Sequence, residues 1–247
     1  MKVLAVIPAR YASTRFPGKP LAMIGNKPMI QWVWEGVKGI GAIGEAVVAT
    51  DDERILKAVE SFGGKAMMTS DSHRSGTDRC GEVLMRMADS KADVVINVQG
   101  DEPRVEHTQI ESLIEAFADN QVQIATLKKR IATQDELFSP NVVKVTTDLK
   151  GNAITFSRNP IPFLRGREQK EWLDAQPYFK HIGIYAFRRE VLEQVVRLKQ
   201  TPIELSESLE QMRWIENGYK IAVRETEVEN IGVDTPEDLA RLNAAVR

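Results

Sequence analysis

Three cationic side chains, Arg10, Arg15 and Lys19, occur in one short segment near the start of the chain, at intervals of five and four residues. The segment IPARYASTRFPGKPL, from Ile7 to Leu21, contains no Asp or Glu, and its Gly18 allows close approach of the backbone. Arginine and lysine are costly to bury without a partner, so they reach either solvent or an anion. A solvated loop is the ordinary outcome. The lack of acids and the spacing favour a chain of phosphates instead.

Two aspartates with flexible or turn-forming neighbours are candidate ligands of a hard cation. Asp101 follows the apolar run Val94–Val98 in the sequence VQGDEP, and Asp234 precedes Thr-Pro-Glu. Mg²⁺ binds one or two carboxylates together with phosphates and water. The structural alternatives are a β-turn residue for Asp101 and a helix N-cap for Asp234.

Alternating apolar and amphipathic segments in the first half predict the elements that position these residues. Nearly continuous apolar runs are typical of buried strands, and apolar residues at helical spacing indicate the helices between them. This alternation predicts a mostly parallel, doubly wound α/β sheet with helices on both faces, and ligands bind such sheets at the carboxyl ends of the strands. The predicted strands are Lys2–Ile7, Ala46–Thr50 and Val94–Val98, and the predicted helices are Met29–Ile40, Asp52–Phe62 and Thr77–Ala88.

The second half is less regular. We predict a hairpin around the turn Asp148–Gly151, then a strand, two helices and a last helix after Asp234. Without repeats or a low-complexity linker, we expect a single domain over residues 1–247, with a hairpin and insertion at about 150–190. The ranges are Val142–Thr147 and Ala153–Ser157 for the hairpin, Ile182–Phe187 for the strand, and Val191–Leu198 and Leu205–Asn217 for the helices.

Composition excludes several classes of partner. The chain has 33 basic and 35 acidic residues, so no cationic excess is available to bind nucleic acid or an anionic membrane. The only cysteine, Cys80, cannot form an intrachain disulfide, and we expect it to be a small buried residue. No apolar stretch approaches the roughly 20 residues of a membrane span. We therefore expect no nucleic acid partner, no membrane insertion and a cytoplasmic location.

The segment IPARYASTRFPGKPL resembles the signature loop of sugar nucleotidyltransferases, and most closely that of the 3-deoxy-manno-octulosonate cytidylyltransferases. Six further blocks resemble the same family and follow in the family's order over nearly the whole chain. These blocks are SGTDRC, NVQGDEP, FSRNPIP, HIGIYAF, LEQMRW and GVDTPEDL. The resemblance implies the nucleotidyltransferase variant of the doubly wound sheet, which agrees with the strand pattern.

The resemblance also implies a reaction. The anomeric hydroxyl of 3-deoxy-manno-octulosonate (KDO) attacks the α-phosphate of CTP, which gives CMP-KDO and pyrophosphate and requires Mg²⁺. It implies catalytic roles for Lys19, Arg10 and Asp101, and metal binding by Asp101 and Asp234. Helix capping by Thr77 is the structural alternative for the SGTDRC block. The nucleotide-binding residues implied are Arg10, Arg15, Lys19, Arg74, Ser75, Gly76, Thr77 and Gln99.

A sugar acid requires an Arg or His for its carboxylate and amide or carboxylate groups for its hydroxyls. Adjacent residues on a helix point about 100° apart, so Glu210 and Gln211 can share a sugar only near a helix end. A solvated helix face for Glu210 and a structural role for His181 are the alternatives. The candidate sugar-binding residues are Arg158, Arg165, His181, Tyr185, Glu210 and Gln211.

Other readings of the sequence remain open. One is a cytidylyltransferase for another sugar acid, such as a sialate or an amino variant of KDO. Another is a non-catalytic nucleotide-binding regulator on the same fold, although Lys19, Asp101 and Asp234 are all present. The family further implies a homodimer and a place in lipopolysaccharide biosynthesis.

Overall fold

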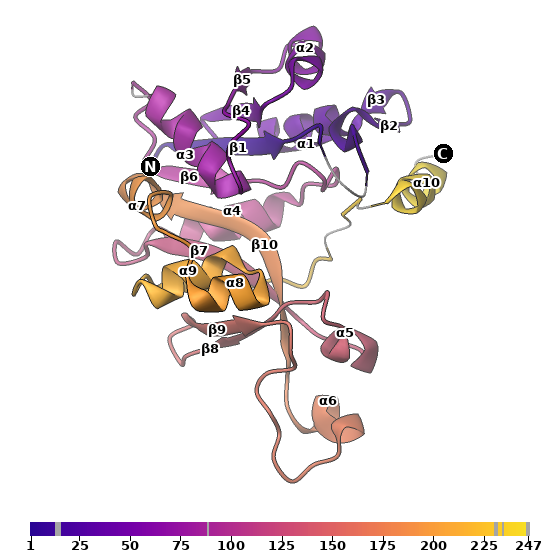
Figure 1. Ribbon diagram of the computed structural model, residues 1–247, viewed down its shortest axis with the longest axis vertical. Coiled ribbons are helices and arrows are strands. Elements are labelled where there is room, and N and C mark those ends of the chain that lie inside the picture. Colours follow the sequence, from indigo (N-terminus) through magenta and orange to yellow (C-terminus); the bar gives the residue numbers. More distant parts are fainter. Residues whose placement is uncertain (13–15, 88, 230–231, 234, 246–247) are drawn as a thin grey trace.

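A mostly parallel sheet forms the centre of the computed structural model (Figure 1), which describes residues 1–12, 16–87, 89–229, 232–233 and 235–245. β1 pairs in parallel with β4 and with β6, while β10 runs antiparallel to both β6 and β7. The predicted fold class is confirmed. The strand order is β11-β7-β10-β6-β1-β4-β5, made of Ile221–Glu225, Ile124–Arg130, Phe179–Arg188, Val94–Asn97, Val3–Ala9, Glu45–Thr50 and Ala66–Met68.

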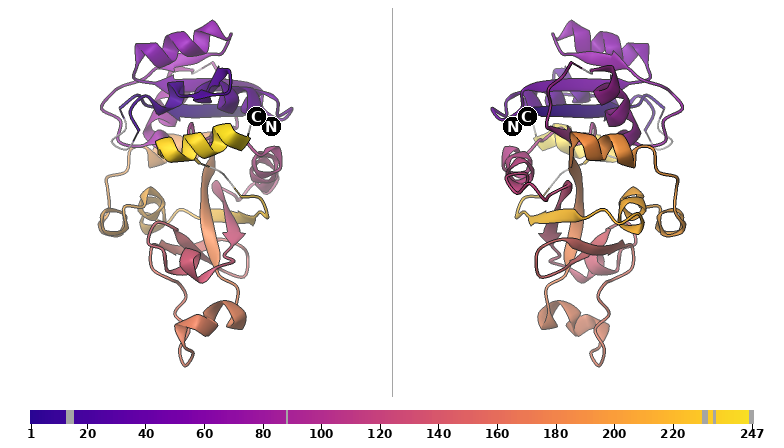
Figure 2. Two further views of the ribbon diagram at one scale, coloured as in Figure 1. Left: turned by 90° about the vertical axis from the view of Figure 1, so that its right-hand side faces the viewer. Right: turned by 90° about the vertical axis from the view of Figure 1, so that its left-hand side faces the viewer.

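Both faces of the sheet are covered by helices (Figure 2). Alternate residues of β1 enter opposite cores, because successive side chains of a strand point to opposite faces. Val3, Ala5 and Ile7 pack with α1 (Met29–Lys38), α2 (Glu53–Ser61) and α4 (His107–Ala116). Leu4 and Val6 pack with α3 (Gly76–Arg86), α7 (Arg189–Val195) and α9 (Glu210–Glu216). The predicted helices of the first half are therefore present, and Asp52 caps α2 as expected. Cys80 is buried, also as expected.

The hairpin of the second half is confirmed as β8 (Lys144–Thr147) and β9 (Ala153–Ser157), with Gly151 at a φ of 82° in its turn. β8 continues the sheet from β10. Beyond it, α5 (Gln134–Phe138), η2 (Gln169–Glu171) and α6 (Trp172–Ala175) lie at the end of the molecule opposite α2 (Figure 1). A small apolar cluster of Ile131, Leu137, Trp172 and Tyr178 supports this end.

One predicted helix is wrong. In place of a single helix over Leu205–Asn217, the chain forms α8 (Pro202–Glu207) and then α9. Ser208 separates them with a φ of 51° and a ψ of 49°, the left-handed region that ends a helix. The apolar periodicity continues across the break, so the pattern alone does not reveal it. α9 consequently begins at Glu210, and its first turn presents both Glu210 and Gln211.

The C-terminal helix α10 (Pro236–Ala245) returns to the first half of the chain. It lies beside the short hairpin of β2 (Met23–Ile24) and β3 (Lys27–Pro28), where the Asn243 side chain accepts from Gly25 N at 2.8 Å. Thr235 caps this helix through Asp238 N at 3.2 Å, so capping does not require Asp234. Within the described ranges, no helix combines the length and apolar character that crossing a bilayer demands.

Candidate active site

The cationic loop after β1 meets an acidic loop after β6. Lys19 begins the short helix η1 (Lys19–Leu21), and its Nζ lies 2.7 Å from Asp101 Oδ2. Gly18 adopts a φ of 70°, and a Cβ there would come within 3.1 Å of the Tyr11 ring. Only glycine fits this turn without strain. The acid missing from the loop's own sequence is thus supplied by Asp101, from the end of a neighbouring strand.

The end of β1 also approaches the acidic loop through its backbone. A Cβ on Gly100 would lie 2.6 Å from Pro8 O, which is closer than any real side chain could approach. Asp101 O accepts a hydrogen bond from Val233 N at 3.0 Å, and the Val233 side chain is fully buried. Val233 is the residue before Asp234 in the sequence, so the two predicted metal ligands belong to segments that meet here. Asp234 itself, like Arg15, lies outside the described residues.

Arg10 is held near the start of α3. Its guanidinium donates to His73 O. Burial and the neighbouring Arg79 charge lower the pKa of Arg10 below its usual value, while the Asp51 carboxylate opposes this shift. Arg79 is fully buried and donates to Asp51 and to Thr69 Oγ1. Arg10 thus faces a second guanidinium, and an incoming anion would relieve that repulsion.

The start of α3 connects the two halves of the chain. Ser75, rather than Thr77, is the N-cap, in a capping box with Asp78. The expected alternative of capping by Thr77 is therefore wrong, because the Thr77 hydroxyl is used elsewhere. It donates to Glu210 Oε2 at 2.7 Å. Gly76 packs tightly, since a Cβ there would lie 3.2 Å from Pro8 Cγ.

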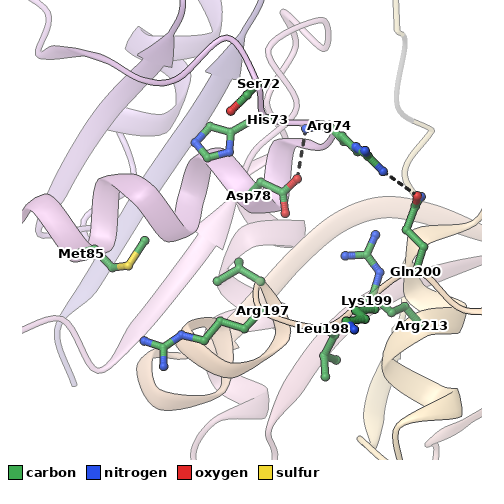
Figure 3. Close-up of a pocket in the computed structure, with 11 residues that line it drawn as sticks. Ser72, His73, Arg74, Asp78, Met85, Arg197, Leu198, Lys199, Gln200 and Arg213 are labelled. Atoms are coloured by element: carbon green, nitrogen blue, oxygen red, sulfur yellow. Dashed lines mark hydrogen bonds between the residues drawn. The ribbon is translucent and has the colours of Figure 1, made fainter.

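A cavity of about 520 Å³ borders this region (Figure 3). Arg74 reaches across it from the first half to Gln200 Oε1 at 3.0 Å. Arg197 and Lys199 add positive charge to the lining. Arg10, Lys19 and Asp101 do not line the cavity, so it lies beside the cationic site rather than containing it. A smaller cavity shares Arg74 and Gln200 and extends to Ser75 and Glu210.

Three of the candidate sugar-binding residues, His181, Tyr185 and Glu210, lie close together. The rings of His181 and Tyr185 lie 5.3 Å apart, and burial lowers the pKa of His181 to about 3. Burial and the nearby Glu210 charge raise the pKa of Tyr185 well above its usual value, and its hydroxyl has no partner among the described residues. Burial also raises the pKa of Glu210. Gln211 follows Glu210 at the start of α9 and is 5% exposed.

The two candidate arginines make no side-chain hydrogen bond to this cluster within the described residues. Arg158 donates through Nε to Glu207 O at 2.7 Å and through Nη1 to Pro140 O at 3.0 Å. Its guanidinium therefore holds the end of α8 in place. Arg165 is exposed in the segment between β9 and α6. In the part of the chain that the structure describes, neither guanidinium makes a hydrogen bond to the His181 ring.

Gln99, predicted to contact the nucleotide, has a structural contact. Its Nε2 donates to Gly183 O at 2.8 Å, which ties the acidic loop to β10. The sequence reasoning missed Asn97, whose buried Oδ1 is unpartnered within the described residues and whose register partner is Tyr185. It also missed Thr126, which contacts His181. Asn97 belongs to the NVQGDEP block that resembles the family, so the sequence could have indicated it. Thr126 belongs to none of these blocks.

Comparison with known proteins adds three findings. Residues 4–221 match the family described as Cytidylyltransferase. The chain is 51% identical over 245 residues to the 3-deoxy-manno-octulosonate cytidylyltransferase of Parabacteroides distasonis, which covers 98% of this chain and 96% of that protein. It is 53% identical to the protein of that name from Bacteroides thetaiotaomicron, over 97% of this chain and 96% of the relative.

A solved structure is also similar. It is the CMP:2-keto-3-deoxy-manno-octonic acid synthetase complexed with CTP, with a TM-score of 0.91, 42% identity, and coverage of 100% of this chain and 98% of that one. A cytidylyltransferase from Leptospira borgpetersenii has a TM-score of 0.62 at 16% identity, with coverage of 100% and 87%, and shares the fold.

Proposed function

Because the chain belongs to the 3-deoxy-manno-octulosonate cytidylyltransferase family and is a nucleotidyltransferase, we propose that it transfers CMP from CTP to KDO. The C2 hydroxyl oxygen of KDO forms a bond to the α-phosphorus, the bond from that phosphorus to the bridging oxygen breaks, and pyrophosphate leaves. The hydroxyl proton is released to solvent. The observation that carries the proposal is the ion pair between Lys19 and Asp101, where the cationic loop meets an acidic loop at the ends of parallel strands.

Phosphoryl-type transfer depends mainly on positioning and on neutralising charge. Arg10 and Lys19 come from the loop that follows β1, so both reach the same edge of the sheet. A triphosphate at this edge would relieve the repulsion between Arg10 and Arg79. Lys19 is a flexible point charge that can move from Asp101 to a phosphate oxygen. We assign Arg15 the same role from its place in the loop sequence.

We propose that Asp101 and Asp234 hold Mg²⁺ together with the phosphates. The Asp101 side chain is 35% exposed, so a ligand can reach it, and the contact from Val233 brings the other segment near. Mg²⁺ takes one or two carboxylates and completes its shell with phosphate and water, so two aspartates are sufficient protein ligands. Bound Mg²⁺ would neutralise charge on the phosphate oxygens.

We propose that the sugar acid binds beside α9 and β10. Glu210 and Gln211 begin α9, which meets the condition that both reach one sugar near a helix end. Tyr185 lies near Glu210, and its ring is 5.3 Å from that of His181. We propose that these four residues bind KDO and that Ser75, Gly76 and Thr77 place the cytidine on the other side. Arg158 contributes by holding the turn before α9.

The direct test is to incubate the protein with CTP, Mg²⁺ and KDO and to follow pyrophosphate release. We expect release with KDO, little with a sialate, and none after chelation of Mg²⁺. Release with a sialate but not with KDO would show that the substrate is another sugar acid. Binding of CTP without release for any sugar acid would favour the non-catalytic regulator. A place in lipopolysaccharide biosynthesis, a cytoplasmic location and a homodimer belong to the same proposal.

A further inference from the structure

The strand β10 is interrupted between His181 and Tyr185, two of the candidate sugar-binding residues. Ile182 pairs with Leu127 and Tyr185 pairs with Thr126, so Gly183 and Ile184 have no opposite residues in β7. Residues four apart in a regular strand are separated by about 13 Å. The His181 and Tyr185 rings nevertheless lie 5.3 Å apart. The bulge bends the strand and brings the two rings to one place.

The bulge leaves the carbonyl groups of Ile182, Gly183 and Ile184 to be hydrogen-bonded by side chains of the two neighbouring strands. The Thr126 hydroxyl of β7 lies 2.8 Å from Ile184 O and 3.2 Å from Ile182 O. From the end of β6, Gln99 Nε2 donates to Gly183 O at 2.8 Å. Thr126 is fully buried. Because an unpaired buried carbonyl is costly, these contacts fix the bulge in one conformation.

The same hydroxyl determines the protonation of His181. Thr126 Oγ1 lies 2.9 Å from His181 Nε2. The hydroxyl has one hydrogen, and the carbonyl of Ile184 can only accept it. The hydroxyl therefore accepts from His181, so Nε2 carries the proton. In the neutral ring, Nδ1 is then an acceptor, and it makes no hydrogen bond within the described residues.

We propose that Thr126 is a positioning residue that fixes His181 as the neutral Nε2–H form, so that Nδ1 accepts a hydrogen bond from a hydroxyl of the sugar acid. This inference rests on the proposed function for the identity of the substrate. It adds the requirement that His181 binds the sugar acid in one neutral form. A neutral acceptor selects a hydroxyl and disfavours a carboxylate. The expectation that His181 receives the acid group is thereby replaced, and an arginine or a backbone donor must take that group.

The first test is nitrogen NMR of the free protein at pH 7. The chain has three histidines, so the His181 signals can be assigned by their loss in His181→Gln. We expect a protonated Nε2 and an unprotonated Nδ1 in the natural chain. In Thr126→Val, the His181 ring should instead be a mixture of the forms protonated on Nε2 and on Nδ1. A proton on Nδ1 of the natural chain, or a charged ring, would overturn the proposal without reference to any substrate.

The second test is kinetic. Thr126→Val should raise KM for KDO about five- to tenfold, the effect of one hydrogen bond, and change KM for CTP less than about twofold. Thr126→Ser, which keeps the hydroxyl, should restore the KDO value. Thr146→Val in β8 is the matched control, because that hydroxyl makes no hydrogen bond within the described residues.

The two tests separate the inference from the function on which it rests. An equal rise in both KM values, or failure of Thr126→Ser to restore binding, would contradict a role specific to the sugar acid. Thermal melting of each variant identifies loss of folding, and the NMR result on the natural chain stands if Thr126→Val does not fold. If the natural chain produced no CMP-KDO, the proposed function would fail while the NMR measurement still decided the form of His181.

Discussion

The ion pair between Lys19 and Asp101 joins a proposed phosphate-binding residue to a proposed metal ligand. Its two members lie 13% and 35% exposed, so both remain partly accessible to a ligand. A single ion pair that is partly accessible to solvent contributes little to stability. Its value is therefore in arranging charge, because both members lie close to where the triphosphate would bind. The pair predicts that Lys19 matters for rate more than for folding.

Lys19→Met should reduce kcat by about 10²- to 10³-fold, the usual effect of removing one group that stabilises developing charge. Lys19→Arg keeps the charge on a stiffer side chain and should lose less. Steady-state pyrophosphate release measures both variants, and circular dichroism checks the fold. A Lys19→Met protein with the rate of the natural chain would show that the cationic loop does not act on the phosphates.

His181 should make the protein sensitive to acid. Its pKa falls from 6.5 to about 3 on folding, because burial disfavours the charged ring. The lowered value means that the contribution to stability is present above pH 6.5 and is lost as the pH falls toward 3. Between pH 7 and pH 5, the natural chain should lose about 2 kcal/mol more of its unfolding free energy than His181→Gln.

Urea unfolding at the two pH values measures this difference, and His107→Gln, which replaces an exposed histidine at the start of α4, serves as the control. Parallel losses in the natural chain and in His181→Gln would show that the ring is already solvated and able to charge in the folded protein. That result would also weaken the inferred role of Thr126.

At the scale of elements, the ends of β1 and β6 approach more closely than side chains permit. Gly100→Ala should place a Cβ 2.6 Å from Pro8 O, so the loop that carries Asp101 must move. We expect a loss of stability of about 1–3 kcal/mol and a clear fall in kcat. Gly41→Ala is the matched control, since nothing lies within 4 Å of its Cβ position.

Chemical unfolding and pyrophosphate release together test this prediction. A Gly100→Ala protein as stable and as active as Gly41→Ala would mean that the two strand ends can separate without consequence for Asp101.

The elements that the sequence predicts well are those with a strong local pattern. The strands of the first half and the helix capped by Asp52 follow from apolar periodicity and from one capping residue. The break at Ser208 and the bulge at Gly183 do not, because contacts with distant segments hold each backbone in an irregular conformation. Arg158 is a similar case, since the carbonyl groups that it satisfies come from elements far along the sequence.

At the scale of the whole molecule, three contacts join the two halves around the site. They are the hydrogen bonds of Gln99 with Gly183 O, of Thr77 with Glu210, and of Arg74 with Gln200. The first two connect candidate nucleotide-binding residues to β10 and to α9, and the third connects Arg74 to the loop before α8. The sequence blocks resemble the family in order, but only folding makes them neighbours. The proposed site therefore lies between residues 74–99 and residues 183–210, which are far apart in the sequence.

The proposed homodimer should depend on the apolar residues exposed at residues 150–190. Ile154 is 57% exposed on β9, and Phe163 is 74% exposed beside Trp172, at a ring separation of 5.2 Å. Both belong to the end of the molecule that carries β8, β9 and α6 (Figure 1). A stable interface buries about 800 Å² on each partner, with apolar side chains at its centre. We expect light scattering during gel filtration to give the mass of two chains.

The double variant Ile154→Ser with Phe163→Ser should shift that mass to one chain at micromolar concentration. Met85→Ser on α3, also an exposed apolar position at 51%, should leave it unchanged. Because Arg165 lies in the same segment as Phe163, a monomeric variant with a raised KM for KDO would indicate that the interface orders residues of the sugar site. A natural chain that is monomeric at all concentrations would refute the dimer and leave this segment as a solvent-exposed extension.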